Sequence, residues 1–269
     1  MPTTRSCFIL LALGAISFPV TADARPVCTA VAAAATGKVL IQRGDCSRRV
    51  TPASTFKLAI SLMAYDSGFL IDEHSPALPF HEGYAVWDPS WRATTDPARW
   101  MKYSVVWFSQ QATQSLGEER FHRYVTQFRY GNEDTSGDPG AENGLTHAWL
   151  SSSLLISPLE QLTFLGKVVT RRLGVSAPAY EMTSRITALG VLPNGWIVHG
   201  KAGTGFPFDA AGTADEDHAL GWFVGWATRN GRTLVFARLT QDEKRESVRA
   251  GLRTRAAFLA ELPALLDSL

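Results

Sequence analysis

The chain has 269 residues, of which 45% are hydrophobic and 19% are charged, and this composition is typical of a globular protein with one sizeable core. The formal net charge of +1, without a long run of like charges, gives no reason to expect nucleic acid or an anionic membrane as a partner. The sequence contains no CxxC or HExxH motif and no cluster of histidines and cysteines, so we expect no metal ion.

Residues 1–24 have the features of a cleaved secretory signal. Arg5 precedes an apolar stretch, residues 7–20, that is short for a membrane span. Ala22-Asp23-Ala24 fits a small-x-small cleavage site, so we expect a mature chain from Arg25 onward, in the periplasm or outside the cell and not bound to a membrane. An uncleaved anchor is the alternative. The oligomeric state cannot be read from the sequence.

Residues 25–45 are expected to form two strands. Two apolar runs flank Gly37-Lys38, which would turn the chain into a hairpin. The hairpin brings Cys28 near Cys46, and two cysteines in an exported chain can pair. A Cys28–Cys46 disulfide and two free thiols both fit the sequence.

Residues 51–175 are expected to form mostly helices and loops. Apolar residues recur at helical spacing in four segments, 54–68, 104–116, 119–128 and 158–173. Ser157-Pro158 has the pattern of an N-cap followed by proline at the first helical position.

The first of these helices carries a candidate nucleophile and base. If a helix begins at Ser54, the side chains of Ser54 and Lys57 lie on one face. A serine is a poor nucleophile until a base takes its proton. A helix N-terminus also offers free N–H groups and a positive dipole end to an oxyanion. Ser-x-x-Lys also occurs by chance, with the lysine in solvent, so the motif alone does not establish catalysis.

The last third of the chain returns to strands. They are expected at Trp196–Lys201, Ala219–Ala227 and Thr233–Thr240, with a hairpin turn at Asn230-Gly231, and an amphipathic helix follows at Glu246–Leu266. Strands at both ends with helices between them predict an α+β fold, an α/β sandwich. Its antiparallel central sheet is built from both termini (25–50 and 176–269) and is flanked by helices. An inserted, mainly helical lobe (51–175) completes a single domain, 25–269.

Four further segments are informative when they are taken together and in chain order. Each has an ordinary structural explanation: an N-cap, a turn, a core tryptophan and a lysine at a strand end. These segments are Ser104-Val105-Val106, Tyr130-Gly131-Asn132, Trp149-Leu150 and Lys201-Ala202-Gly203. Together with Pro52-Ala53-Ser54-Thr55-Phe56-Lys57, they make the chain resemble the penicilloyl-serine transferase superfamily and, within it, the class D β-lactamases (oxacillinases). The resemblance covers most of the mature chain, and Tyr-Gly-Asn separates class D from class A, which has Ser-Asp-Asn.

The resemblance implies a hydrolase of penicillins and related β-lactams, expected in a Gram-negative bacterium. Ser54 would be acylated, and the N–H groups of Ser54 and Thr204 would form the oxyanion hole. An apolar pocket would lower the pKa of Lys57, and its expected lining is Phe56, Val106, Trp149 and Leu150. In the family this lysine is N-carboxylated by carbon dioxide or bicarbonate and held by the tryptophan N–H. No other cofactor is expected.

The remaining roles are also implied by the resemblance. Ser104 would pass a proton to the leaving lactam nitrogen, with Lys201 supplying positive potential beside it. Gly203 and Arg249 would contact the substrate, and the Arg249 guanidinium would pair with the substrate carboxylate. Arg253 and Arg255 lie within two turns and leave that choice open, and Tyr130 and Asn132 would be structural.

One residue departs from the family pattern, and rival functions remain. Ala202 stands where many relatives have a threonine or serine, whose hydroxyl helps to hold the substrate carboxylate. Weaker binding of the substrate is therefore expected. A penicillin-binding sensor domain and a D-alanyl-D-alanine peptidase share the resemblance but turn over β-lactams slowly. A phosphate-binding loop at 195–201 lacks its terminal hydroxyl, and no Gly-x-Ser-x-Gly elbow of an α/β-hydrolase is present.

Overall fold

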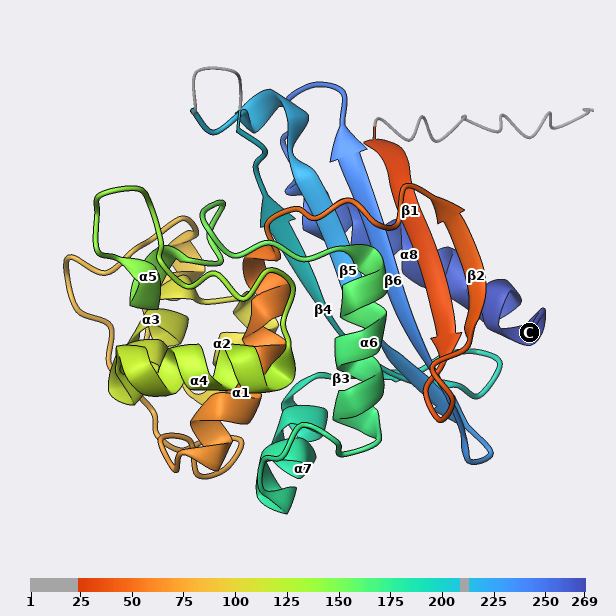
Figure 1. The fold of residues 1–269 in the computed structure, drawn as a ribbon, viewed down its shortest axis with the longest axis horizontal. Coiled ribbons are helices and arrows are strands. Elements are labelled where there is room, and N and C mark those ends of the chain that lie inside the picture. The colour runs from red at the N-terminus through yellow and green to blue at the C-terminus, as the bar shows by residue number, and fades with distance from the viewer. Residues whose placement is uncertain (1–23, 209–212) are drawn as a thin grey trace, which may run out of the picture.

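A twisted antiparallel sheet forms the centre of the molecule (Figure 1). The computed structural model describes residues 24–208 and 213–269, so the expected signal peptide lies, except for Ala24, outside the described residues. Within these ranges the sheet has six strands in the order β2-β1-β6-β5-β4-β3. Their bounds are β1 Ala24–Ala33, β2 Val39–Gly44, β3 Ala188–Val191, β4 Ile197–Gly205, β5 Leu220–Arg229 and β6 Arg232–Asp242. Because β1 pairs with β6, the two termini build one sheet, and the predicted α+β fold is confirmed.

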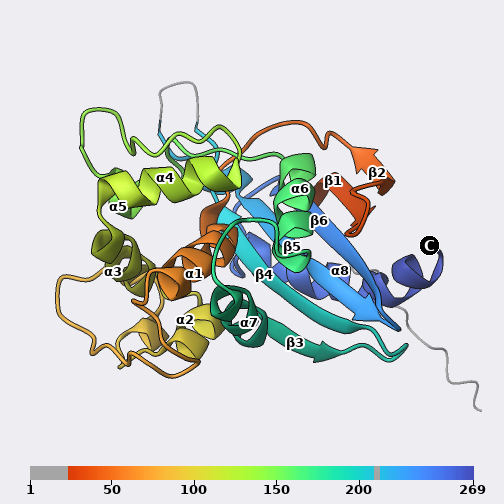
Figure 2. The same cartoon turned by 60° about the horizontal axis from the view of Figure 1, so that its bottom comes forward.

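A helix covers each face of the sheet. Figures 1 and 2 show α6 (Pro158–Val169) on one face and α8 (Ala250–Asp267) on the other. Under α8, Phe258 packs on Phe223 and Phe236, with ring centroids 6.2 and 5.4 Å away. None of the helices in the described ranges combines the length and hydropathy that a membrane span requires.

The helical lobe lies beside the β4 edge of the sheet (Figure 1). It contains the 3₁₀ turn η1 (Ala53–Phe56), α1 (Lys57–Asp66), η2 (Pro89–Trp91), α2 (Pro97–Tyr103), α3 (Val106–Leu116), α4 (Glu118–Phe128) and α5 (Gly144–His147). Every residue of α1 from Lys57 to Tyr65 is buried, which is the pattern of a helix enclosed on all sides. Lys57, the first residue of α1, therefore stands on an enclosed helix.

Three short elements were not predicted from the sequence. These are α2, α7 (Ala177–Ile186) and the edge strand β3; the shorter elements η2, α5 and η3 (Glu216–His218), which precedes β5, were not predicted either. α7 packs against α1, where the hydroxyls of Ser61 and Thr183 lie 2.9 Å apart. The helical lobe is thus completed by a helix from beyond residue 175, which packs on α1.

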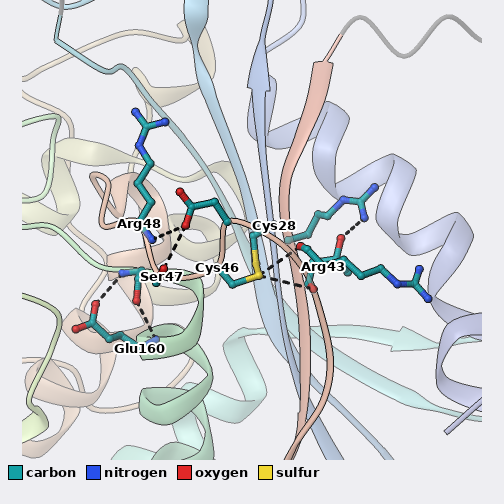
Figure 3. The surroundings of a disulfide bond; sticks show 10 residues. Cys28, Arg43, Cys46, Ser47, Arg48 and Glu160 are labelled. Atoms are coloured by element: carbon teal, nitrogen blue, oxygen red, sulfur yellow. Dashed lines mark hydrogen bonds between the residues drawn. A yellow bond between two sulfur atoms is a disulfide. The ribbon is translucent and has the colours of Figure 1, made fainter.

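The predicted disulfide is present. Cys28 in β1 and Cys46 after β2 are bridged, and both side chains are buried (Figure 3). The backbone carbonyl of Cys46 accepts a hydrogen bond from the N–H of Leu159 at 3.2 Å. At the start of that helix, Ser157 and Glu160 form a capping box, as its N-cap pattern indicated. The bridge therefore joins the hairpin to the segment from which α6 starts.

Removal of this bridge should lower stability without changing the fold. The two cysteines are 18 residues apart in sequence, and in the chain-entropy model a loop of this length corresponds to about 3 kcal/mol. We expect the Cys28→Ala/Cys46→Ala variant to lose about that free energy of unfolding in urea. Wild-type protein unfolded under reducing conditions is the control, and coincident curves for the oxidised and reduced proteins would contradict the prediction.

Candidate active site

Ser54 and Lys57 meet at the junction of η1 and α1. The Lys57 Nζ lies 3.1 Å from the Ser54 Oγ, because residues three apart are eclipsed in a 3₁₀ turn. Ser54 is not the first residue of an α-helix, as the sequence suggested, but the second residue of η1, which continues into α1. Lys57 is fully buried, whereas Ser54 is partly exposed, so the pair opens to solvent on the serine side.

The surroundings of Lys57 disfavour its ammonium form. Phe56, Val106 and Trp149 are buried in the same hydrophobic core, and Leu150 packs against that core from a half-buried position. Burial lowers the pKa of Lys57 well below its ordinary value, and the nearby charge of Lys201 lowers it further. This shift favours the neutral amine, which is the form that can act as a base.

Trp149 carries a polar atom without a partner. Its indole Nε1 is buried and makes no hydrogen bond with any described residue. Leaving a buried donor unsatisfied costs about 1–3 kcal/mol, so such a group points to an acceptor that completes it.

A second lysine and serine face each other across the two lobes. The Lys201 Nζ lies 3.0 Å from the Ser104 Oγ and donates to the Ala202 carbonyl at 2.9 Å. Burial, followed by the charges of Arg255 and Arg249, lowers the pKa of Lys201 to about 7. Ser104 does not open a helix, because it ends α2 in the left-handed region at φ 60° and α3 begins at Val106. This backbone turn leaves the hydroxyl free to face Lys201.

The backbone of β4 runs directly against the nucleophile turn. A Cβ on Gly203 would lie 3.0–3.1 Å from the backbone nitrogens of Thr55 and Ser54, tighter than most real contacts, so a side chain there would press on the nucleophile turn. Thr204 follows on the same strand, and its Oγ1 accepts a hydrogen bond from the Gly251 N–H at 2.9 Å. The proposed oxyanion donors, the N–H groups of Ser54 and Thr204, therefore belong to two segments in close contact.

Hydroxyl groups tie three segments of the site together, and sequence reasoning missed them. The Thr51 Oγ1 donates to the Trp149 carbonyl at 3.0 Å and accepts from the Ser151 N–H at 3.0 Å. The Ser151 Oγ in turn accepts from the N–H of Phe206 at 2.9 Å. The segment before Ser54, the loop after Trp149 and the end of β4 are thus fixed to one another. Isolated serine and threonine hydroxyls carry no sequence signal for such contacts.

Tyr130 and Asn132 lie behind the nucleophile turn rather than in it. The Gln161 amide donates to the hydroxyls of both Thr55 and Tyr130, at 3.1 and 3.2 Å. The Asn132 side chain donates to the Ser153 carbonyl and accepts from the N–H of Leu155, both at 2.8 Å. These contacts support the structural roles that were expected for the two residues.

Arg249 is held by the opposite lobe. Its Nη2 donates to the Asp88 carboxylate at 2.8 Å and to the Trp87 carbonyl at 3.1 Å. Ala202 points the other way from Lys201 and packs in the core under α8. The structure therefore brings together Ser54 with Lys57 and Ser104 with Lys201, while the guanidinium of Arg249 is already paired.

The buried charge of Lys201 should make stability depend on pH. Below about pH 7 the lysine is an ammonium in the folded and unfolded states, and its full desolvation cost falls on the folded state. Between pH 7 and the ordinary lysine pKa, the unfolded state binds more protons, so stability rises with pH. Lys201→Met removes this cost.

We expect Lys201→Met to be more stable than wild type, by roughly 3 kcal/mol more at pH 6.5 than at pH 9.5, since one pKa unit corresponds to about 1.4 kcal/mol. Guanidinium unfolding of both proteins at the two pH values measures the difference. An equal stability difference at both pH values would show that Lys201 keeps an ordinary pKa.

Comparison with known proteins shows the family of this chain. A family model described as the penicillin binding protein transpeptidase domain matches residues 27–264. β-Lactamase OXA-9 of Klebsiella pneumoniae is 46% identical over 245 residues, covering 90% of this chain and 88% of that protein. β-Lactamase OXA-1 of Escherichia coli is 39% identical over 201 residues, covering 72% and 67%.

The solved structures give the same family. The crystal structure of the class D β-lactamase OXA-427 is 47% identical, with a TM-score of 0.85, and the match covers 90% of this chain and 98% of that one. The chain therefore belongs to the class D β-lactamases, within the penicillin-binding protein transpeptidase family.

Proposed function

We propose that the chain is a serine β-lactamase that hydrolyses the β-lactam amide of penicillins and related antibiotics through an acyl-enzyme on Ser54, and so confers resistance to them. The observation that carries this proposal is the buried Lys57 amine 3.1 Å from the Ser54 hydroxyl. Membership in the class D family supports it. The sequence of residues 1–24 supports a place in the periplasm or outside the cell.

Acylation begins with the transfer of a proton from Ser54 to the Lys57 side chain. An ammonium could not accept that proton, and the dry core around Lys57 is what keeps the side chain basic. The Ser54 Oγ then attacks the lactam carbonyl carbon. Negative charge develops on the carbonyl oxygen, where the N–H groups of Ser54 and Thr204 stabilise it. One such donor contributes about 3–4 kcal/mol to lowering the barrier.

Opening of the ring leaves a lactam nitrogen that needs a proton. We assign its delivery to the Ser104 hydroxyl, which is replenished by the Lys201 amine 3.0 Å away. With a pKa of about 7, Lys201 can hold or release a proton near neutral pH, as a general acid must.

The residues around Lys57 fit its carboxylated form. Carbon dioxide reacts with a neutral amine, which burial provides, and the unpartnered Trp149 N–H is a donor suited to a carbamate oxygen. The carbamate supplies a carboxylate base, which serves acylation and also the activation of water for deacylation. That second duty separates a β-lactamase from a penicillin-binding sensor or a D-alanyl-D-alanine peptidase, which stay acylated.

Two substitutions test the nucleophile and the base. Ser54→Ala should abolish covalent labelling by benzylpenicillin, and Lys57→Ala should slow the labelling of Ser54 and reduce turnover at least 100-fold, because the base for both steps is lost. Mass spectrometry follows the label, and a chromogenic cephalosporin follows turnover. Ser61→Ala is a matched control, since this hydroxyl lies one turn beyond Lys57 and, among the described residues, bonds to Leu58 and Thr183 and not to Ser54 or Lys57.

The same assay tests the proposed reaction class. Wild type should hydrolyse many equivalents of the cephalosporin per enzyme. A single stoichiometric burst would identify a sensor or peptidase instead, and labelling of Ser54→Ala would place the nucleophile elsewhere.

Loss of the unpaired Trp149 N–H should weaken the carboxylation of Lys57. Trp149→Phe keeps an aromatic ring but removes the N–H, so we expect turnover to require more added bicarbonate, most clearly at low pH, where carbamates decompose. The ¹³C NMR signal of a lysine carbamate after addition of labelled bicarbonate should decrease as well. Trp100→Phe is the control, because the Trp100 N–H bonds to Ser109 in the core. Equal bicarbonate dependence in both variants would remove Trp149 from this role.

A further inference from the structure

The hydroxyl of Thr51 lies between the turn that contains Ser54 and the backbone of Trp149. Its Oγ1 donates to the Trp149 carbonyl and accepts from the Ser151 N–H, both at 3.0 Å, and the Ala53 N–H is 3.4 Å from it. Ala53 and Ser151 have φ values of 48° and 54°, in the left-handed region that favours glycine. Such conformations persist only where the surroundings fix them, so one hydroxyl supports the backbone at two strained positions.

Thr51 is itself held in place by the sheet. Its carbonyl accepts a hydrogen bond from the Trp222 indole N–H of β5 at 2.9 Å. A Cβ on Gly205 of β4 would lie 2.5 Å from the Thr51 Cγ2, so the methyl group packs directly on that strand. Threonine has few χ1 rotamers, and with its methyl group against β4 the hydroxyl is directed at Trp149 and not at the sheet.

This contact fixes the residue that offers the unpaired N–H. The Trp149 indole packs on the rings of Phe56 and Phe121, with centroids 5.6 and 6.2 Å away. The Trp149 carbonyl is held by Thr51, and the Nε1 is buried and has no partner among the described residues. With the ring packed and the backbone held, the N–H is oriented before an acceptor arrives, and a preorganised donor binds its acceptor more tightly than a mobile one.

We propose that Thr51 is a positioning residue for the carboxylation of Lys57. Its hydroxyl holds the backbone of Trp149 so that the indole N–H stays directed at the carbamate. This proposal rests on the proposed function and deepens it. Among the described residues, the Thr51 hydroxyl bonds to neither Ser54 nor Lys57, so it acts through Trp149 and not on the reacting atoms.

Removal of this hydroxyl should weaken carboxylation. Thr51→Val has nearly the same shape, and we expect it to need about 10-fold more bicarbonate for half-maximal formation of the lysine carbamate, as for the loss of one buried hydrogen bond. The ¹³C NMR signal of the carbamate measures this without any β-lactam. Thr51→Ser keeps the hydroxyl and should stay close to wild type. Thr51→Ala is a second variant without the hydroxyl, and circular dichroism checks that each protein is folded.

Thr254→Val is a matched control. The Thr254 and Thr51 side chains belong to residues that are each 4% exposed, but the Thr254 hydroxyl bonds to Ala250 and Thr240 under α8. Thr254→Val should lose stability in urea and keep the wild-type bicarbonate requirement. A general effect of losing a buried hydroxyl would raise the requirement in this variant as well, and would overturn the assignment.

The double variant Thr51→Val/Trp149→Phe tests whether Thr51 acts through the indole N–H. In a protein that already lacks this N–H, loss of the Thr51 hydroxyl should add nothing, so the double variant should need as much bicarbonate as Trp149→Phe. Additive effects, a wild-type requirement in Thr51→Val, or no carbamate signal in wild type would overturn the assignment. Carbamate formation without hydrolysis of the cephalosporin would contradict the proposed function alone, so the two failures are distinguishable.

Discussion

The account depends on the removal of water from the Lys57 amine. A charged lysine is expensive in an apolar core, so the folded state favours the neutral amine, and that amine stands within hydrogen-bond distance of Ser54. The same packing that encloses α1 therefore creates the base. Lys201 adds to the effect, because its nearby positive charge disfavours a second charge on Lys57. A stable core and a reactive serine follow from one arrangement of side chains.

The fold holds this arrangement between two lobes that are fixed to each other. β4 brings a glycine backbone against η1, and the hydroxyls of Thr51 and Ser151 link that strand end to the Trp149 loop. Ala53, Ser104 and Ser151 all have positive φ values although none is a glycine. Such conformations cost about 1–3 kcal/mol each and persist where the surroundings over-determine them, as they do here on three sides of the site.

Much of the fold could be predicted because its signals are local. The Asn230-Gly231 turn has both residues at positive φ, as its hairpin pattern requires, and the Ser157 cap begins α6 where expected. The 3₁₀ geometry of Ser54 was not predictable, because it depends on contacts between residues 51–56 and β4 that are remote in sequence. Helix α7 was not predicted, because its apolar face becomes recognisable only from its packing against α1.

The residues of the site also differ in how far they could be predicted from the sequence. Ser54, Lys57, Ser104 and Lys201 could be selected because their motifs recur in a fixed order, and the structure brings them together in two pairs. The arginines could not be ranked from the sequence. Their difference lies in partners such as Asp88, which is 161 residues from Arg249 along the chain and 2.8 Å from it in space.

The protonation state of Lys57 tests the central claim most directly. Protein labelled with ¹³C at the lysine Cε, with the Lys57 signal identified by its loss in Lys57→Ala, can be titrated by NMR between pH 6 and 11. The account predicts a Lys57 signal that is not that of an ammonium at pH 7.5, whether the amine is free or carboxylated. A Lys57 signal that stays that of an ammonium at pH 7.5 and titrates near 10.4, the usual value for lysine, would contradict it.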